Sequence, residues 1–129
     1  MSKSAIICVD DEVVILDSLK KQLKRKFSDR FIYEMAESAE EAWELIEELH
    51  NDGIEVIVIV SDWLMPGTKG DEFLIQIHQR FPKVIKVMLT GQADEAAIEN
   101  ARKEANLHAC LYKPWTEEEL TQIVTTAID

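Results

Sequence analysis

The side chains of this sequence that could do chemistry stand directly after short runs of apolar residues. Asp62 follows the run at 56–60 past a single serine, and Pro66-Gly67 then marks a loop. An apolar run of that length is typical of a strand buried on both faces, so Asp62 is expected at the strand's carboxyl end. Other polar residues hold the same place after their own runs: Asp10, Asp11 and Glu12; Thr90 and Gly91; and Lys113 and Pro114.

Together these side chains favour phosphoryl chemistry. Two carboxylates about 4 Å apart repel each other by roughly 4 kcal/mol at an effective dielectric constant near 20, so a cluster of aspartates requires a cation. Oxygen ligands suit Mg²⁺, whereas the histidines are scattered and show no spacing typical of zinc. A carboxylate nucleophile, a metal ion, a hydroxyl and an ammonium would meet the charge of a transferred phosphoryl group. Taken singly, each residue also has an ordinary role: Asp11 as a helix cap, Asp62 as a turn residue, Thr90 as a strand residue and Lys113 as a solvated cation.

The chain alternates short apolar runs with segments of helical spacing. Ser38 and Thr116 each precede a glutamate by three residues, which is the spacing of a capping box at a helix start. Repeated strand–helix units predict an α/β fold, doubly wound, with helices on both faces of a parallel sheet. Ligands bind such sheets at the carboxyl ends of the strands. The expected strands lie at 5–9, 31–36, 56–60, 84–89 and 109–112.

Composition limits the classes of function. A chain of 129 residues, 47% of them hydrophobic, fits one domain over 1–129, and its formal net charge of −11 disfavours direct binding to nucleic acid. The basic segment 20–26 is expected to be the solvated face of a helix. Cys8 and Cys110 lie in runs expected to be buried strands, so no disulfide framework is expected. The sequence has neither a secretory signal nor an apolar stretch of membrane-spanning length, which favours a cytoplasmic protein.

Four motifs resemble, in this order and over essentially the whole chain, the receiver domain of two-component response regulators: Asp10-Asp11, "DWLMPG" at 62–67, Thr90-Gly91 and Lys113-Pro114. The resemblance implies a flavodoxin-like (βα)5 fold of three layers with the sheet order 2-1-3-4-5. It also implies a cis peptide before Pro114. Asp62 would accept a phosphoryl group from a sensor histidine kinase or a phosphotransfer protein.

The resemblance also implies roles for the other site residues. Asp11 and the phosphoacceptor would bind Mg²⁺ directly, together with the backbone carbonyl of Leu64, and Asp10 would act largely through water. Thr90 would donate a hydrogen bond to one phosphoryl oxygen, and Lys113 would pair with another. Any catalysis would be limited to the domain's own phosphorylation and dephosphorylation.

Phosphorylation would switch the face formed by the fourth helix, fifth strand and fifth helix. That face would control a partner, an output domain C-terminal to this chain, or a phosphorylation-dependent homodimer. The predicted fourth helix, from about 94 to 105, has Ile98 as its one large aliphatic side chain. Because little apolar area anchors it, we expect it to move more readily than the first helix.

Two positions depart from the family's pattern. The aromatic switch residue that usually stands three positions before the lysine is Cys110 here. Tyr112 shares that face of the strand, so it either replaces the switch residue and couples to Thr90, or is an ordinary packed strand residue. Leu64 cannot orient an attacking water, so control of hydrolysis would come from elsewhere, with Gln92 as a candidate.

Three other functions fit parts of the sequence. A haloacid dehalogenase-type phosphatase would need an acid two residues after its nucleophile, where Leu64 stands. A flavodoxin-like FMN carrier would need a phosphate-binding loop after the first strand, where Asp10, Asp11 and Glu12 would repel phosphate. A receiver-shaped module that is never phosphorylated is the third alternative, although the full set of acid, hydroxyl and lysine argues against it.

Overall fold

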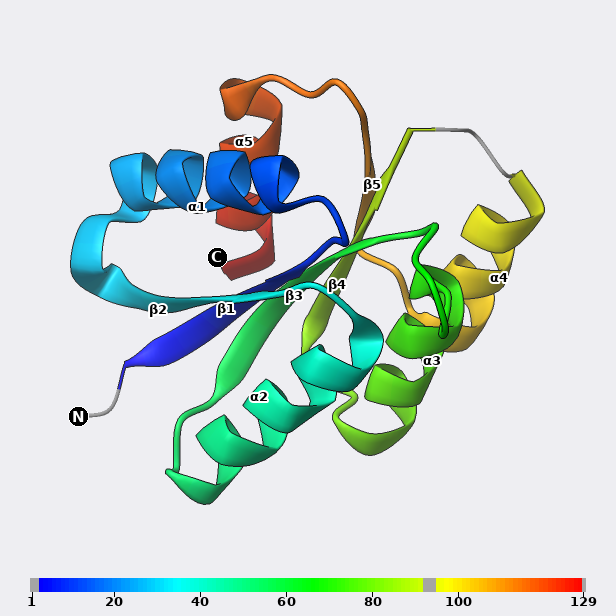
Figure 1. Cartoon of the computed structure of the whole chain (residues 1–129), viewed down its shortest axis with the longest axis horizontal. Coiled ribbons are helices and arrows are strands. Elements are labelled where there is room, and N and C mark those ends of the chain that lie inside the picture. Colours follow the sequence, from blue (N-terminus) through cyan, green and yellow to red (C-terminus); the bar gives the residue numbers. More distant parts are fainter. Residues whose placement is uncertain (1–2, 92–94, 129) are drawn as a thin grey trace.

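A parallel β-sheet with helices on both faces forms the molecule (Figure 1). The computed structural model describes residues 3–91 and 95–128. The strands are ordered β2-β1-β3-β4-β5, which confirms the predicted doubly wound fold and its order 2-1-3-4-5. Their bounds are β1 (Ser4–Val9), β2 (Phe31–Ala36), β3 (Val56–Asp62), β4 (Ile85–Thr90) and β5 (Ala109–Tyr112).

The helices divide into two layers, as Figure 1 shows. Helices α1 (Val13–Phe27) and α5 (Glu117–Ile128) cover one face, and a short 3₁₀ turn, η1 (Ser28–Arg30), leads from α1 into β2. The other face is covered by α2 (Ala39–Asn51), α3 (Gly70–Arg80) and α4 (Glu95–Ala105). Because side chains alternate along a strand, each strand contributes residues to the apolar cores on both faces of the sheet.

Strand β1, which lies between β2 and β3, shows this alternation clearly. Ile7 and Val9 face the α2–α4 layer, whereas Ile6 and Cys8 face the α1–α5 layer. Cys8 is fully buried, and this burial, with a smaller contribution from the charge of Asp10, raises the pKa of its thiol to about 12. Cys110 is a free thiol as well, but it is only partly buried, contrary to expectation, because β5 is an edge strand.

Capping residues mark two helix starts as the sequence predicts. Ser38 Oγ accepts the backbone N–H of Glu41 at 3.1 Å. Thr116 and Glu119 form a reciprocal box, in which each side chain accepts the other residue's backbone N–H, at 3.1 and 2.8 Å. These bonds satisfy donors that have no partner within the helix.

The basic segment of α1 lies at the surface, as expected. Lys21 pairs with Asp17 one turn earlier, and Arg25 makes a bidentate ion pair with Glu117 of α5. Over the part of the chain that the structure describes, no helix combines the length and apolar character needed to cross a membrane.

A bulge interrupts the pairing between β1 and β3 near their amino ends. Ala5 pairs with Val56 and Ile6 pairs with Val58, so Ile57 is the extra residue. As a result Ile57 and Val58 both face the α1–α5 layer, while Val56 and Ile59 face the α2–α4 layer.

Candidate functional site

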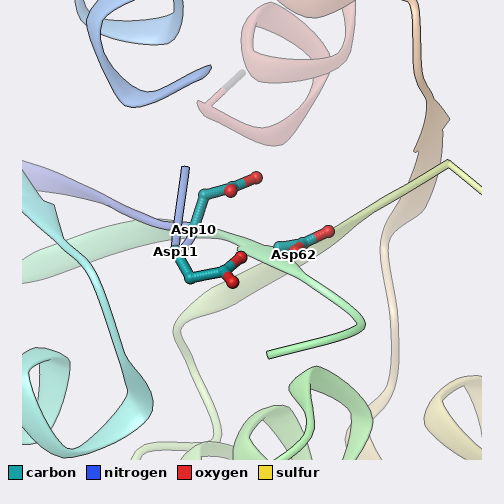
Figure 2. A group of neighbouring side chains, drawn as sticks. All are labelled: Asp10, Asp11 and Asp62. Atoms are coloured by element: carbon teal, nitrogen blue, oxygen red, sulfur yellow. The ribbon is translucent and has the colours of Figure 1, made fainter. Parts of the chain in front are cut away.

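The carboxyl ends of four strands bring the predicted polar residues to one edge of the sheet. Asp10 follows β1, Asp62 and Thr90 close β3 and β4, and Lys113 follows β5. Asp10, Asp11 and Asp62 lie together at this edge (Figure 2), and one carboxylate oxygen from each lies within 4.8 Å of the others. The three sequence-predicted aspartates thus form one cluster.

Asp10 is fully buried, and both of its carboxylate oxygens have neighbours within the chain. Oδ1 accepts the backbone N–H of Glu12 at 2.8 Å, and Oδ2 lies 3.0 Å from the ammonium of Lys113. Glu12 is the N-cap residue of α1, so the alternative role of Asp11 as that cap is wrong. Asp10 therefore ties the start of α1 to the lysine that follows β5.

Lys113 lies between two buried carboxylates. Its Nζ is 3.0 Å from Asp10 Oδ2 and 3.2 Å from Asp62 Oδ1, with exposed Glu12 farther away at 3.8 Å. Burial alone would lower the pKa of this ammonium, but the hydrogen bond and charge of Asp10 and the charge of Asp62 outweigh it and raise the pKa. Its backbone N–H donates to the Thr90 carbonyl at 2.8 Å, which fixes the strand ends relative to each other.

Ionisation of the Asp62 carboxyl group is disfavoured by its surroundings. Burial, then the charge of Asp10, raises its pKa from 3.8 to about 6, and Lys113 offsets only part of this. Three carboxylates against one ammonium leave an excess of negative charge among hard oxygen donors. This donor set fits a small divalent cation such as Mg²⁺.

The β3–α3 loop holds Asp62 through its backbone. Ser61 Oγ donates to the Asp62 carbonyl at 3.0 Å, and the Gly70 N–H donates to the Trp63 carbonyl at 2.7 Å. A Cβ at Gly70 would overlap the backbone carbonyl oxygen of Asp62. Gly70 was not predicted from the sequence, although a glycine at a helix start was an available signal.

The other predicted residues differ in their exposure to solvent. Asp11 is exposed, the Leu64 side chain is 56% exposed in the loop, and Thr90 is buried. Gln92 and the predicted start of the fourth helix at 94 lie outside the described residues.

Tyr112 lies beside Cys110 on the edge strand. The pKa of its phenol is raised by the charge of Cys110, by burial and by a hydrogen bond with Cys110, and further by Glu95 of α4. Tyr112 is paired in register with Thr90, and its side chain is half exposed. Tyr112 therefore lies beside the end of β4 and next to the position where an aromatic residue is missing, and its phenol is close enough to α4 to be affected by the charge of Glu95.

Known proteins resemble the chain over nearly its full length. Residues 6–125 match the model of the response regulator receiver domain. The hydrogenase transcriptional regulatory protein HoxA of Cupriavidus necator is 29% identical over 127 residues, which are 98% of this chain and 24% of HoxA. The chain thus spans about a quarter of that relative's length.

Solved structures give the same result. The signal receiver domain of an HD domain-containing protein from Pseudomonas fluorescens Pf-5 is 28% identical, with a TM-score of 0.86 over 98% of this chain and 94% of that one. The beryllofluoride-activated NtrC4 receiver domain dimer is 27% identical, with a TM-score of 0.82 over 95% of this chain and 94% of that one.

Proposed function

The chain belongs to the response regulator receiver domain family, and on that premise we propose that Asp62 is its phosphoacceptor. The observation that carries this proposal is the position of the Asp62 carboxylate, which ends a buried strand 3.2 Å from Lys113 and beside Asp10 and Asp11. An Asp62 oxygen forms the new bond to phosphorus as the bond from phosphorus to the donor's histidine nitrogen breaks. Lys113 and Thr90 then hold the phosphoryl oxygens.

Asp11, Asp62 and the Leu64 carbonyl would hold Mg²⁺, with Asp10 acting through water. The two oxygens of Asp10 already have protein partners, which supports an indirect role for it. The ion would neutralise charge on the phosphoryl oxygens. Beyond its own phosphorylation and dephosphorylation, we assign the domain no catalytic activity.

Labelling by acetyl phosphate tests the phosphoacceptor directly. With Mg²⁺ present, intact-mass measurement should show one added phosphoryl group on the wild type and none on Asp62→Asn. Asp17→Asn, on the exposed face of α1, is the matched control and should be labelled like the wild type. Labelling of Asp62→Asn to the wild-type extent would show that another residue is the acceptor. An unlabelled wild type would favour the interaction module that is never phosphorylated.

The donor docks, in this proposal, on the apolar side chains around Asp62. Val13, Val14, Leu64 and Tyr112 are the large hydrophobic residues that are exposed among the described residues, and all four lie near the carboxyl edge of the sheet. Such a patch next to a reactive group is typical of a protein-binding surface. We assign it to a sensor histidine kinase or a phosphotransfer protein.

In this proposal, phosphorylation changes the conformation of the face formed by α4, β5 and α5. Helix α4 buries Ile98 and three alanines, whereas α1 buries three leucines and a phenylalanine, so α4 has the weaker apolar anchor. Tyr112 contributes to this switch in place of the missing aromatic, together with Thr90 and Cys110. Its contacts with Cys110 and its proximity to Glu95 of α4 support that role.

Tyr112→Ala separates the switch from the phosphorylation reaction. We expect this variant to bind beryllofluoride at Asp62 while losing the amide chemical-shift changes of α4 that the wild type shows. Tyr33→Ala, in β2 and in the core on the other face of the sheet, serves as the aromatic control. A wild-type response of α4 in Tyr112→Ala would show that the signal bypasses the phenol.

We place residues 1–129 in one cytoplasmic receiver domain that does not bind nucleic acid directly. Its output domain, where one exists, would lie C-terminal to it. The similar NtrC4 receiver domain is a dimer in its beryllofluoride-activated form, and this supports a phosphorylation-dependent homodimer as one output.

A further inference from the structure

Helix α1 is connected to the segment around Lys113 at two separate points. At the start of the helix, Asp10 accepts the backbone N–H of Glu12 with one carboxylate oxygen and contacts Lys113 Nζ with the other at 3.0 Å. In the middle of the helix, Gln22 Oε1 accepts the indole N–H of Trp115 at 2.7 Å. The helix thus contacts both the ammonium of Lys113 and the residues that follow it.

The bond between Gln22 and Trp115 is better shielded than the ion pair beside it. Both residues are partly buried, and the Trp115 ring packs against the apolar core beneath α1 and α5. The neighbouring pair, Arg25 with Glu117, has an arginine side chain that is 65% exposed. Ion pairs exposed to this extent contribute little, because water screens the charges. Gln22 is therefore the stronger anchor of this segment on α1.

A stiff helix joins the two contacts into one restraint. Each residue of a helix rises by about 1.5 Å, so about 15 Å of α1 separates Glu12 from Gln22. Between Lys113 and Trp115 lies only Pro114, whose ring fixes its φ angle. The contact of Trp115 with the helix therefore limits where the backbone at Lys113 can lie relative to the start of α1.

We propose that Gln22 is a positioning residue for Lys113 and that it acts through Trp115. The hydrogen bond keeps the ammonium where it meets a phosphoryl oxygen on Asp62. This inference rests on the phosphoacceptor site of the proposed function and adds a residue from the middle of α1 to it. The amide of Gln22 itself takes no part in phosphoryl transfer.

A second pair of tryptophan and glutamine provides a matched control. Trp43 of α2 donates its indole N–H to Gln76 Oε1 of α3 at 3.3 Å. This pair joins two helices on the other face of the sheet, and neither residue is next to a site residue in the chain. Loss of this bond therefore shows what breaking such a pair does when Lys113 is not involved.

Beryllofluoride, a mimic of the phosphoryl group, tests the position of Lys113 in the whole chain. At saturating Mg²⁺, fluorine NMR should show that Gln22→Leu binds beryllofluoride about threefold more weakly than the wild type, because part of one hydrogen bond's contribution is lost. Trp115→Phe keeps an aromatic ring but removes the donor, so it should weaken binding equally, and the double variant should weaken it no further. Gln22→Glu keeps the acceptor oxygen and should bind like the wild type, as should Gln76→Leu.

The affinity for Mg²⁺ alone distinguishes positioning of the lysine from a general loosening of the site. In the proposed function Asp11, Asp62 and the Leu64 carbonyl hold the ion, and a displaced ammonium would repel it less. Gln22→Leu should therefore bind Mg²⁺ at least as tightly as the wild type, measured by amide chemical shifts around Asp62. Parallel weakening of Mg²⁺ and beryllofluoride, wild-type beryllofluoride affinity in Gln22→Leu, or an equal loss in Gln76→Leu would each overturn the proposal.

Lys113→Ala shows which of the two proposals has failed. This variant should bind beryllofluoride about tenfold more weakly than the wild type or worse, because a charge-assisted hydrogen bond is lost. If it does so while Gln22→Leu binds normally, only the role of Gln22 is refuted. If Lys113→Ala binds like the wild type, the role of Lys113 in the proposed function is refuted together with that of Gln22.

Discussion

Lys113 and Lys86 are both largely buried, but they lie at opposite edges of the sheet among different partners. Lys113 stands between Asp10 and Asp62, which raise the pKa of its ammonium above the ordinary value despite burial. Lys86 contacts a histidine and a carbonyl, and burial lowers its pKa. The same side chain offsets an excess of negative charge at the first edge and adds an uncompensated charge at the second. The two ends of one sheet therefore differ: the carboxyl edge favours a buried positive charge, and the opposite edge disfavours one.

Glycine substitutions should reveal the largest difference between the two edges. Gly70→Ala places a methyl group on the Asp62 carbonyl oxygen, and neither backbone can move away easily, so we expect a loss of about 4 kcal/mol. Gly53, in the turn between α2 and β3 at the opposite edge of the sheet, has a φ of +75° but open space around it, so Gly53→Ala should lose about 1 kcal/mol. Urea unfolding measures both. Equal losses would mean that the close approach at Gly70 relaxes without cost.

Replacing each lysine with methionine should change stability in opposite directions. Lys113→Met leaves two buried carboxylates without their cation and should destabilise the metal-free protein by about 2 to 3 kcal/mol. Lys86→Met removes a buried charge while keeping the side chain's length, and should stabilise it by about 1 kcal/mol. The midpoint of urea unfolding at neutral pH compares the pair. A change of the same sign in both variants would contradict the contrast.

Asp62→Asn tests whether the carboxylates at the carboxyl edge destabilise the metal-free fold. Because ionisation of Asp62 is disfavoured in the fold, the variant should be more stable than the metal-free wild type by about 1 to 2 kcal/mol at neutral pH. Mg²⁺ should raise the melting temperature of the wild type more than that of the variant, since it binds the native cluster. Differential scanning calorimetry with and without Mg²⁺ measures both effects. A metal-free variant no more stable than the wild type would show that the carboxylates do not crowd one another.

Mild acid should change the stability contributions of the two edges in opposite directions. The folded pKa of Asp62, about 6, exceeds its ordinary value, so its ionisation penalty is lost as the pH falls through 6, and the advantage of Asp62→Asn should shrink by about 1 kcal/mol. The pKa of His78 is lowered by burial and by Lys86, so the fold loses stability as the pH falls below 6.5. His78→Gln should therefore become more stable relative to the wild type as the pH falls. Unfolding curves at pH 7.5 and 5.5 without metal decide this, and parallel curves for all three proteins would refute it.

The residues at the carboxyl edge were largely predictable, because their position depends on the order of strands and polar residues along the chain. Once apolar runs at 5–9 and 56–60 are strands of one parallel sheet, Asp10 and Asp62 must lie at the same edge. The pairing of Asp10 with Lys113 was not predicted, because it depends on which oxygen faces which strand end. Gly70 was missed for a related reason: a glycine at a helix start is visible in the sequence, but the close approach of two backbones that requires it depends on the tertiary fold.

The opposite edge was not predictable in the same way. Lys86 lies inside an apolar run, and its partner His78 comes from another element, so no local pattern pairs them. The bulge at Ile57 is equally hidden, because all residues around it are aliphatic and either register buries apolar side chains. Cys110 was expected to be buried from its run alone, but exposure at an edge strand depends on the strand order.

Cys8 gives the molecule an internal reporter of core opening. Its thiol is fully buried between the sheet and the α1–α5 layer, and its pKa of about 12 keeps it protonated, so alkylating reagents can attack it only after this core opens. Cys110, partly exposed on the edge strand, should react earlier. Iodoacetamide added to the native protein should therefore modify the two thiols in separate kinetic phases. The slow phase measures how often the core beneath α1 and α5 opens.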